Sequence, residues 1–66
     1  MFKVSQKVWS HVFGDGVVVA VEKYPFCTCV SVDFNGNRQV FNRDGIWLCP
    51  DVWDIDYIMS RTIYPR

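Results

Sequence analysis

Apolar and polar residues alternate along much of this chain in short runs, and each run ends at or near glycine, proline or asparagine. Short runs of period two are typical of β-strands, whereas an amphipathic helix repeats every three to four residues. The pattern predicts five strands, at residues 7–11, 16–23, 29–34, 37–42 and 46–49. Pro25 and Pro50 follow the second and fifth runs, where the missing N–H of proline ends a strand.

Two glycines flank Asp15 between the first two predicted strands. Glycine adopts a positive φ without a steric penalty, so we expect both Gly14 and Gly16 to bend the chain sharply here. The residues that follow are rich in valine, whose β-branched side chain favours a buried strand. The segment therefore predicts a small, tightly bent β-structure.

A β-hairpin is predicted around Asn35-Gly36, the dipeptide that best fits a two-residue turn with positive φ at both positions. Directly opposed residues of a hairpin share a face of the sheet. This register predicts a core face of four apolar side chains: Val30, Val32, Phe34 and Phe41. It also places Asp33 opposite Arg38 as an exposed ion pair and leaves Val40 pointing outward.

The tail of the chain allows two interpretations. Residues 51–59 predict either a helical turn capped by Asp51 or a last strand through Ile55, Tyr57 and Met59. Five short strands with little helical signal predict one all-β domain over residues 1–66, with residues 50–66 as its tail. We expect a small SH3-like barrel of the Tudor or KOW type, because closure protects sheet edges in so short a chain.

Composition limits the function classes that fit this fold. Half of the 66 residues are hydrophobic, which makes a dense core available to a chain of this length. Seven basic and seven acidic side chains cancel, whereas proteins that coat DNA through its phosphates normally carry a basic excess. No apolar run approaches the ~18 residues of a membrane span, and the mixed first residues predict no signal peptide.

Three cysteines, Cys27, Cys29 and Cys49, cannot all pair within one chain, which is typical of reduced thiols in the cytosol. Adding His11 would complete a Cys3His set for zinc. Structural zinc sites usually separate paired cysteines by two to four residues, but only Thr28 separates Cys27 from Cys29, and there is no second pair. We therefore expect the thiols to pack as small apolar groups, and we expect no metal or other cofactor.

Catalytic patterns are also weak, and we expect no enzymatic activity. His11 has no nucleophile at a motif spacing. The Gly14-Asp15-Gly16 turn lacks the third glycine, the lysine and the following helix of a phosphate-binding loop. The acidic cluster in the tail lacks the glycine and bidentate glutamate of a calcium-binding loop, so a solvated acidic edge is expected there.

Aromatic residues outnumber what the core requires. We assign Phe13, Phe34, Phe41 and Trp9 to the core, which leaves a surplus of three rings: Trp47, Trp53 and Tyr57. The surplus lies among four aspartates, Asp44, Asp51, Asp54 and Asp56, and no lysine or arginine occurs between Arg43 and Arg61. Carboxylates around exposed rings repel nucleic acid and suit a basic protein surface.

The predicted partner-binding residues are therefore Trp47, Asp51, Trp53, Asp54 and Tyr57. The alternative is that these rings only seal the open end of the barrel. Stacking on nucleic-acid bases or enclosure of a methylated lysine is a further use of exposed rings on a small barrel.

Several segments resemble a group of small proteins from bacterial viruses and prophages. They are Val8-Trp9-Ser10-His11, Phe13-Gly14-Asp15-Gly16-Val17-Val18, Val30-Ser31-Val32-Asp33-Phe34, Gly36, Phe41 and Asp44-Gly45. More loosely, they are similar to the C-terminal Tudor-like domain of UvrD-type helicases and to the polymerase-interacting domain of CarD-type regulators. The resemblance covers about residues 4–49 and implies a β-barrel interaction module, with RNA polymerase contacted by the two named relatives. The tail after Pro50 matches neither group.

These observations together predict a non-catalytic binding module that a phage or prophage encodes and that attaches to a host protein in the cytoplasm. RNA polymerase and a helicase are among the candidate partners. Two alternatives stay open. A nucleic-acid-binding barrel would bind DNA or RNA with an affinity that falls steeply with salt, and a structural subunit would form a concentration-dependent oligomer.

Overall fold

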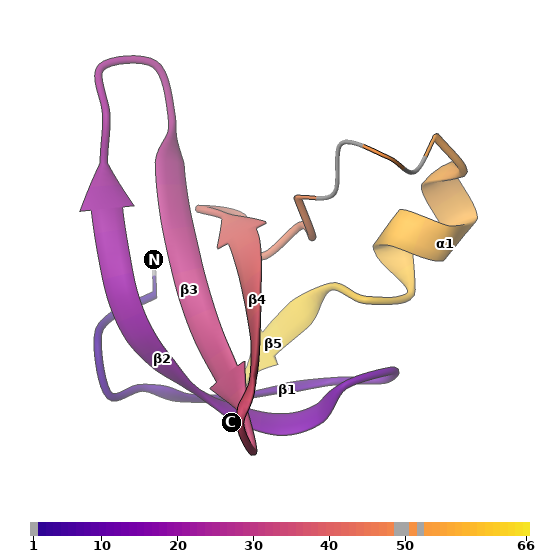
Figure 1. Cartoon of the computed structure of the whole chain (residues 1–66), viewed down its shortest axis with the longest axis horizontal. Coiled ribbons are helices and arrows are strands. Elements are labelled where there is room, and N and C mark those ends of the chain that lie inside the picture. Colours follow the sequence, from indigo (N-terminus) through magenta and orange to yellow (C-terminus); the bar gives the residue numbers. More distant parts are fainter. Residues whose placement is uncertain (1, 49–50, 52) are drawn as a thin grey trace.

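The computed structural model describes residues 2–48, 51 and 53–66. The strands are β1 (Lys7–Ser10), β2 (Gly14–Lys23), β3 (Thr28–Phe34), β4 (Asn37–Asn42) and β5 (Ile63–Pro65), and the one helix in these residues is α1 (Ile55–Met59). They form an antiparallel sheet in the order β4-β3-β2-β1-β5, from which α1 projects at one side (Figure 1). The predicted all-β fold is confirmed.

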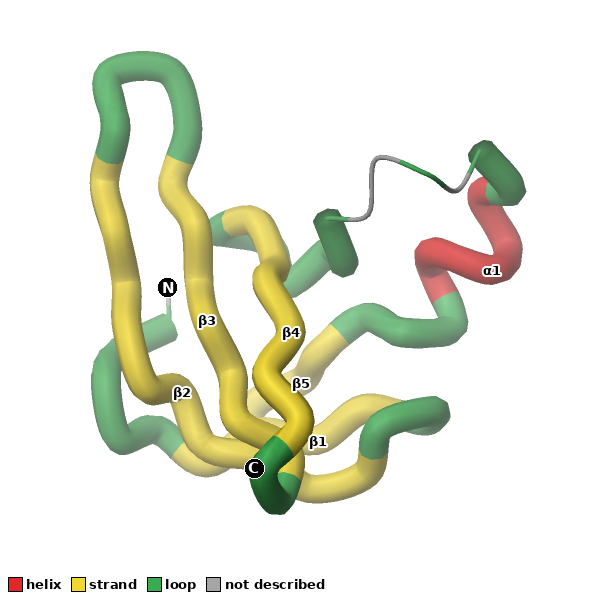
Figure 2. The backbone as a smooth tube through the Cα atoms, in the orientation of Figure 1, coloured by secondary structure: helices red, strands yellow, loops and turns green. Residues whose placement is uncertain are grey.

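The long strand β2 lets one sheet curve into a barrel-like shape. Its register with β3 shifts between Val18 and Ala20, and a bulge of this kind bends a strand and increases its twist. The first part of β2 pairs with β1 and the remainder continues along β3 (Figure 2). The sheet therefore folds over one face, which becomes the core.

Of the predicted strand at residues 46–49, the described residues 46–48 form a single β-bridge, between Phe41 and Trp47. The N–H of Leu48 donates to the carbonyl of Val40 in β4 at 2.9 Å, whereas the carbonyl of Gly45 accepts from Ile63 in β5 at 3.0 Å. The segment therefore bonds to β5 at Gly45 and to β4 at Leu48, and its described residues form no continuous ladder with either strand. Cys49 lies outside the described residues.

The hairpin between β3 and β4 has the predicted register, with Phe34 opposite Asn37 and Val30 opposite Phe41. Asn35 and Gly36 have φ values of 55° and 94°, as the two-residue turn requires. Asp33 stands opposite Arg38, but the predicted ion pair is wrong. The carboxylate of Asp33 instead accepts a hydrogen bond from the N–H of Gly36 at 3.0 Å, so it serves the turn.

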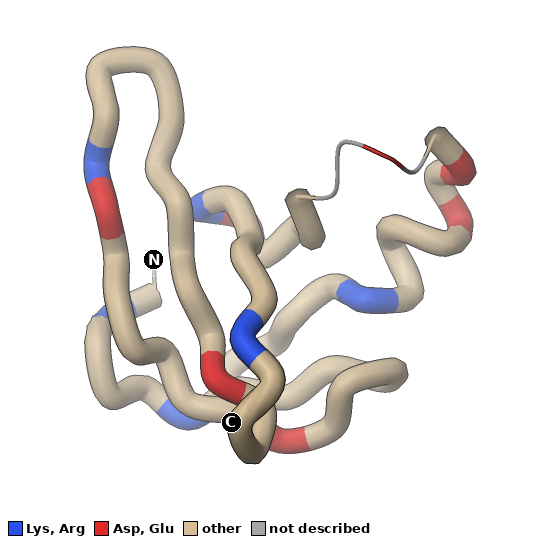
Figure 3. Tube along the Cα trace, in the orientation of Figure 1, with Lys and Arg blue, Asp and Glu red and all other residues tan. Residues whose placement is uncertain are grey.

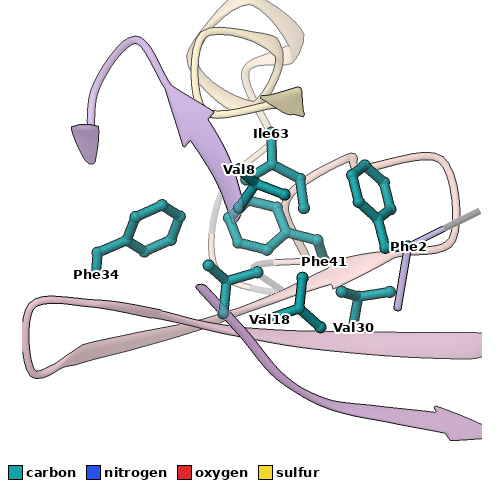
Figure 4. Packing of buried hydrophobic residues seen from close by; sticks show 8 residues of the cluster. Phe2, Val8, Val18, Val30, Phe34, Phe41 and Ile63 are labelled. Atoms are coloured by element: carbon teal, nitrogen blue, oxygen red, sulfur yellow. The ribbon is translucent and has the colours of Figure 1, made fainter. Parts of the chain in front are cut away.

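The core lies on the inner face of the curved sheet (Figure 4). Its buried members are Phe2, Val8, Val18, Val30, Val32, Phe34, Phe41 and Ile63. Phe13 packs against this cluster, but the assignment of Trp9 to the core is wrong. Val8 and Ser10 take the inward positions of β1, so the strand alternation turns Trp9 outward. Its ring packs on Tyr64, its partner in β5, with a centroid separation of 4.9 Å.

The tail is a helix followed by a strand. Residues 55–59 are helical, which excludes the predicted strand through Ile55, Tyr57 and Met59. The predicted N-cap at Asp51 is also wrong, because Asp54 caps the helix. Residues 63–65 then return to the sheet as β5, which the sequence pattern had not indicated. In the described part of the chain, no helix is long and apolar enough to cross a membrane.

Candidate protein-binding surface

The short helix α1 begins at an N-terminal cap, Asp54. The Oδ1 atom of Asp54 accepts hydrogen bonds from the N–H groups of Asp56 and Tyr57, at 3.0 and 3.4 Å. This satisfies donors that have no partner within the first helical turn. None of the five residues of α1 is buried. The helix therefore leaves most of its side chains exposed to the solvent, and Asp54 has a structural role in addition to its charge.

Trp47 lies between the core and α1, where it contacts Tyr57. Its indole Nε1 donates to the Oε1 of Gln39 at 3.1 Å, and its ring meets Phe13 edge to face at 5.9 Å. Trp47 is half-buried and packs against the core cluster. Of the five predicted partner-binding residues, this one fits the alternative interpretation, in which a ring seals the end of the barrel.

Tyr57 packs against both Trp47 and the guanidinium of Arg61. Its ring centroid lies 5.9 Å from that of Trp47. The guanidinium carbon of Arg61 lies 3.5 Å from the centre of the Tyr57 ring and 5.3 Å from that of Trp47. One guanidinium nitrogen also donates to the Tyr57 carbonyl at 2.8 Å. Arg61 thus contacts Tyr57 in α1 through stacking and a hydrogen bond, and it links the helix to the barrel through its contact with Trp47.

Arg61 is the residue that sequence reasoning missed. Residues 44–60 contain no lysine or arginine, but the turn after α1 places the guanidinium of Arg61 over Tyr57 and Trp47. Residues four apart lie on the same side of a helix, and Tyr57 and Arg61 have that spacing. The spacing is a usable signal only if the tail is known to be helical, and the sequence pattern left this open.

Trp53 is the most exposed of the surplus rings, with 92% of its surface accessible. Ile55, at 64%, and Met59, at 44%, continue the exposed apolar surface along α1. Trp53 takes part in none of the ring contacts found in the described residues. The structure therefore brings Trp47 and Tyr57 together and leaves Trp53 and Asp51 free of that cluster.

Acidic residues gather at the same end of the molecule. Asp51 and Asp54 precede α1 and Asp56 lies in its first turn, and these positions form the acidic group beside the helix (Figure 3). All three side chains are exposed. We call Trp53, Ile55, Met59 and these three aspartates the helix surface. It combines exposed apolar area with carboxylates, and Arg61 beside it is already engaged with Tyr57.

The residues considered for zinc are not gathered in one place in the described part of the chain, where no group of three or more potential ligands occurs. His11 instead packs edge to face against Trp9, with a centroid separation of 4.8 Å. Cys27 and Cys29 are free thiols at the start of β3, and Cys49 lies outside the described residues. A search of protein-family models, curated proteins and solved structures finds no match to this chain.

Proposed function

We propose that this chain is a non-catalytic protein-binding module that attaches through the helix surface to a protein with a basic face. The observation that carries the proposal is Trp53, a large ring left 92% exposed between two aspartates. Burial of a tryptophan removes roughly 150–250 Å² from water, worth about 4 kcal/mol or more before the costs of association. Such rings commonly act as the anchors of interfaces.

The charge of the helix surface favours a basic partner over nucleic acid. Asp51, Asp54 and Asp56 would repel a phosphate backbone, whereas they would attract lysine and arginine side chains. The neighbouring Arg61, which stacks on Tyr57 and Trp47, offsets only one of these three negative charges. Trp47 and Tyr57 pack together beside this surface and hold α1 in place, and Trp53 is the residue that would be buried against the partner.

The resemblance to phage proteins and to polymerase-interacting domains supplies the first partners to test. A phage or prophage protein of this kind would act in the host cytoplasm. Bacterial RNA polymerase and a UvrD-type helicase are therefore the purified proteins with which binding measurements should begin.

Two exposed aromatic residues make a matched test possible. Phe26, at the far end of the β2–β3 hairpin, is fully exposed and, unlike Trp53, has no aspartate next to it in the sequence. The wild-type chain, Trp53→Ala and Phe26→Ala are immobilised and tested against each purified candidate and against bacterial extract. We expect Trp53→Ala to weaken binding by about 2 kcal/mol or more, about thirtyfold in Kd, and Phe26→Ala to leave it unchanged.

The opposite pattern, with the loss confined to Phe26→Ala, would place the interface on the hairpin instead. Tighter binding of plain duplex DNA than of any protein would support the nucleic-acid alternative. A concentration-dependent oligomer by sedimentation, abolished by Trp53→Ala, would support self-assembly.

A further inference from the structure

The outer end of the β2–β3 hairpin carries two thiols that the proposed function does not use. Cys29 stands directly opposite Glu22 in the ladder. One step further out, the N–H of Tyr24 donates to the carbonyl of Cys27 at 2.8 Å, so the pairing continues past the end of the strand. Residues two apart in an extended chain project to the same face. The side chains of Cys27 and Cys29 therefore lie side by side.

Both thiols are free, and Cys27 is exposed while Cys29 is half-buried. Partial burial and the neighbouring Cys27 thiol raise the pKa of Cys29. The adjacent carboxylate of Glu22 already accepts a hydrogen bond from the Tyr24 hydroxyl. The pair therefore offers two sulfur donors, and the described residues provide no cluster with a third ligand.

Two sulfur donors suit some metal ions and not others. Zinc in structural sites takes four ligands in a tetrahedron, so two thiolates leave it incomplete. Thiolates are soft ligands that select Cu(I), an ion for which two such donors suffice. Two thiolates around Cu(I) carry one net negative charge. The groove beside Cys27, of about 510 Å³, is lined by both Arg43 and Asp44, so this charge remains in contact with solvent.

We propose that Cys27 and Cys29 form a two-thiolate binding site for Cu(I) at the end of the hairpin. On binding, each thiol releases its proton to solvent and each sulfur forms one bond to the ion. Nothing is oxidised or reduced, because the ion enters and stays as Cu(I). The site lies at the end of the hairpin, and its function is independent of the helix surface.

The test is an anaerobic titration with Cu(I) in competition with a coloured Cu(I) chelator. The wild-type chain should bind one ion. Loss of an outer-shell partner alone typically costs 10–100-fold in metal affinity, so Cys27→Ser and Cys29→Ser should each lose about a hundredfold or more. Cys49→Ser is the matched control and should bind as the wild type does. Melting curves without metal establish that each variant is folded.

Two results would overturn the proposal. One is equal affinity in all four proteins, which would assign the ion to other groups. The other is a loss in Cys49→Ser as large as in the other two variants, since the site would then need a third thiol. Phenylarsine oxide, which bridges two adjacent thiols, gives a second readout: it should bind the wild type and Cys49→Ser but neither of the other variants.

Discussion

The ring of Phe34 lies directly over the backbone of Gly16. A Cβ added at Gly16 would stand 2.6 Å from the Cδ1 of Phe34 and 2.8 Å from a methyl carbon of Val32. Gly16 has no positive φ, so the sharp bend expected there is wrong, and the bend belongs to Gly14 with its φ of 82°. Glycine fits at this position because any larger residue would overlap the side chains of Phe34 and Val32 in the core.

This close approach predicts that Gly16→Ala destabilises the fold. Overpacking a well-filled core typically costs about 1–3 kcal/mol, and here both obstructing groups are buried. Urea denaturation measures the change in the free energy of unfolding. A second substitution, Phe34→Leu, should make the Gly16→Ala step less costly, because it removes the ring that the new methyl group meets. Additive effects of the two substitutions would contradict this explanation.

Replacing Gly36 tests the hairpin turn through the backbone alone. Its φ is 94°, and a Cβ at this position would meet no atom within 4 Å. Gly36→Val should therefore lose about 1–3 kcal/mol through strain at positive φ, since steric contact contributes nothing. Gly36→Asn should lose less, because asparagine tolerates this region. If the valine variant melted within a degree or two of the wild type, the turn would not determine the register.

The β3–β4 hairpin was predictable because its determinants are local. The Asn35-Gly36 turn fixes which residues are opposed, and the alternation of Val30, Val32 and Phe34 fixes which face is buried. The strand β5 was not predictable in this way. Its three residues are too few to show a period, and they become a strand only because β1 offers a partner.

Trp9 shows a second limit. Its size suggested the core, but Ser10 takes the inward position beside it. That polar residue is buried because its hydroxyl donates to the Arg61 carbonyl at 3.3 Å and accepts from the N–H of Val12 at 3.3 Å. A buried serine that depends on a residue 51 positions away cannot be recognised from local sequence. The same applies to Arg61 in the candidate site, whose place depends on a helix that the pattern left undecided.

Arg61 is expected to hold α1 against the barrel. Arg61→Ala removes the contact with Trp47 of the barrel together with the stacking on Tyr57 and the hydrogen bond to its carbonyl, and should cost about 0.5–2 kcal/mol. The amide hydrogens of Ile58 and Ser60, which bond within the helix, should exchange faster in this variant. Arg43→Ala, at an exposed arginine in a turn, is the control and should change neither quantity. Unchanged exchange in Arg61→Ala would mean that the helix is held by other contacts.

Zinc should be absent from the purified protein. A closed structural zinc site binds tightly enough to survive purification, so elemental analysis without chelators would detect it. We expect less than about one zinc per several chains, because Cys27 and Cys29 offer only two of the four ligands that such a site requires. Stoichiometric zinc that disappears in Cys27→Ser would contradict this expectation and would point to ligands outside the described residues.

The aspartates of the helix surface should control how fast a basic partner associates. Charges at the rim of an interface act mainly on the association rate, whereas buried anchors act mainly on dissociation. Reversal of Asp54 would confuse the two, because that residue also caps α1. Asp54→Asn removes the charge and keeps a good cap, while Asp54→Ala loses the cap at a cost of about 1 kcal/mol.

Asp51→Lys combined with Asp54→Asn should therefore slow association and reduce its dependence on salt, with the melting temperature unchanged. Trp53→Ala should instead speed dissociation, because it removes the anchor and leaves the charges in place. Stopped-flow mixing with the purified partner at two salt concentrations separates the two effects. Association that is equally fast in the charge variant and the wild type would show that the carboxylates lie outside the interface.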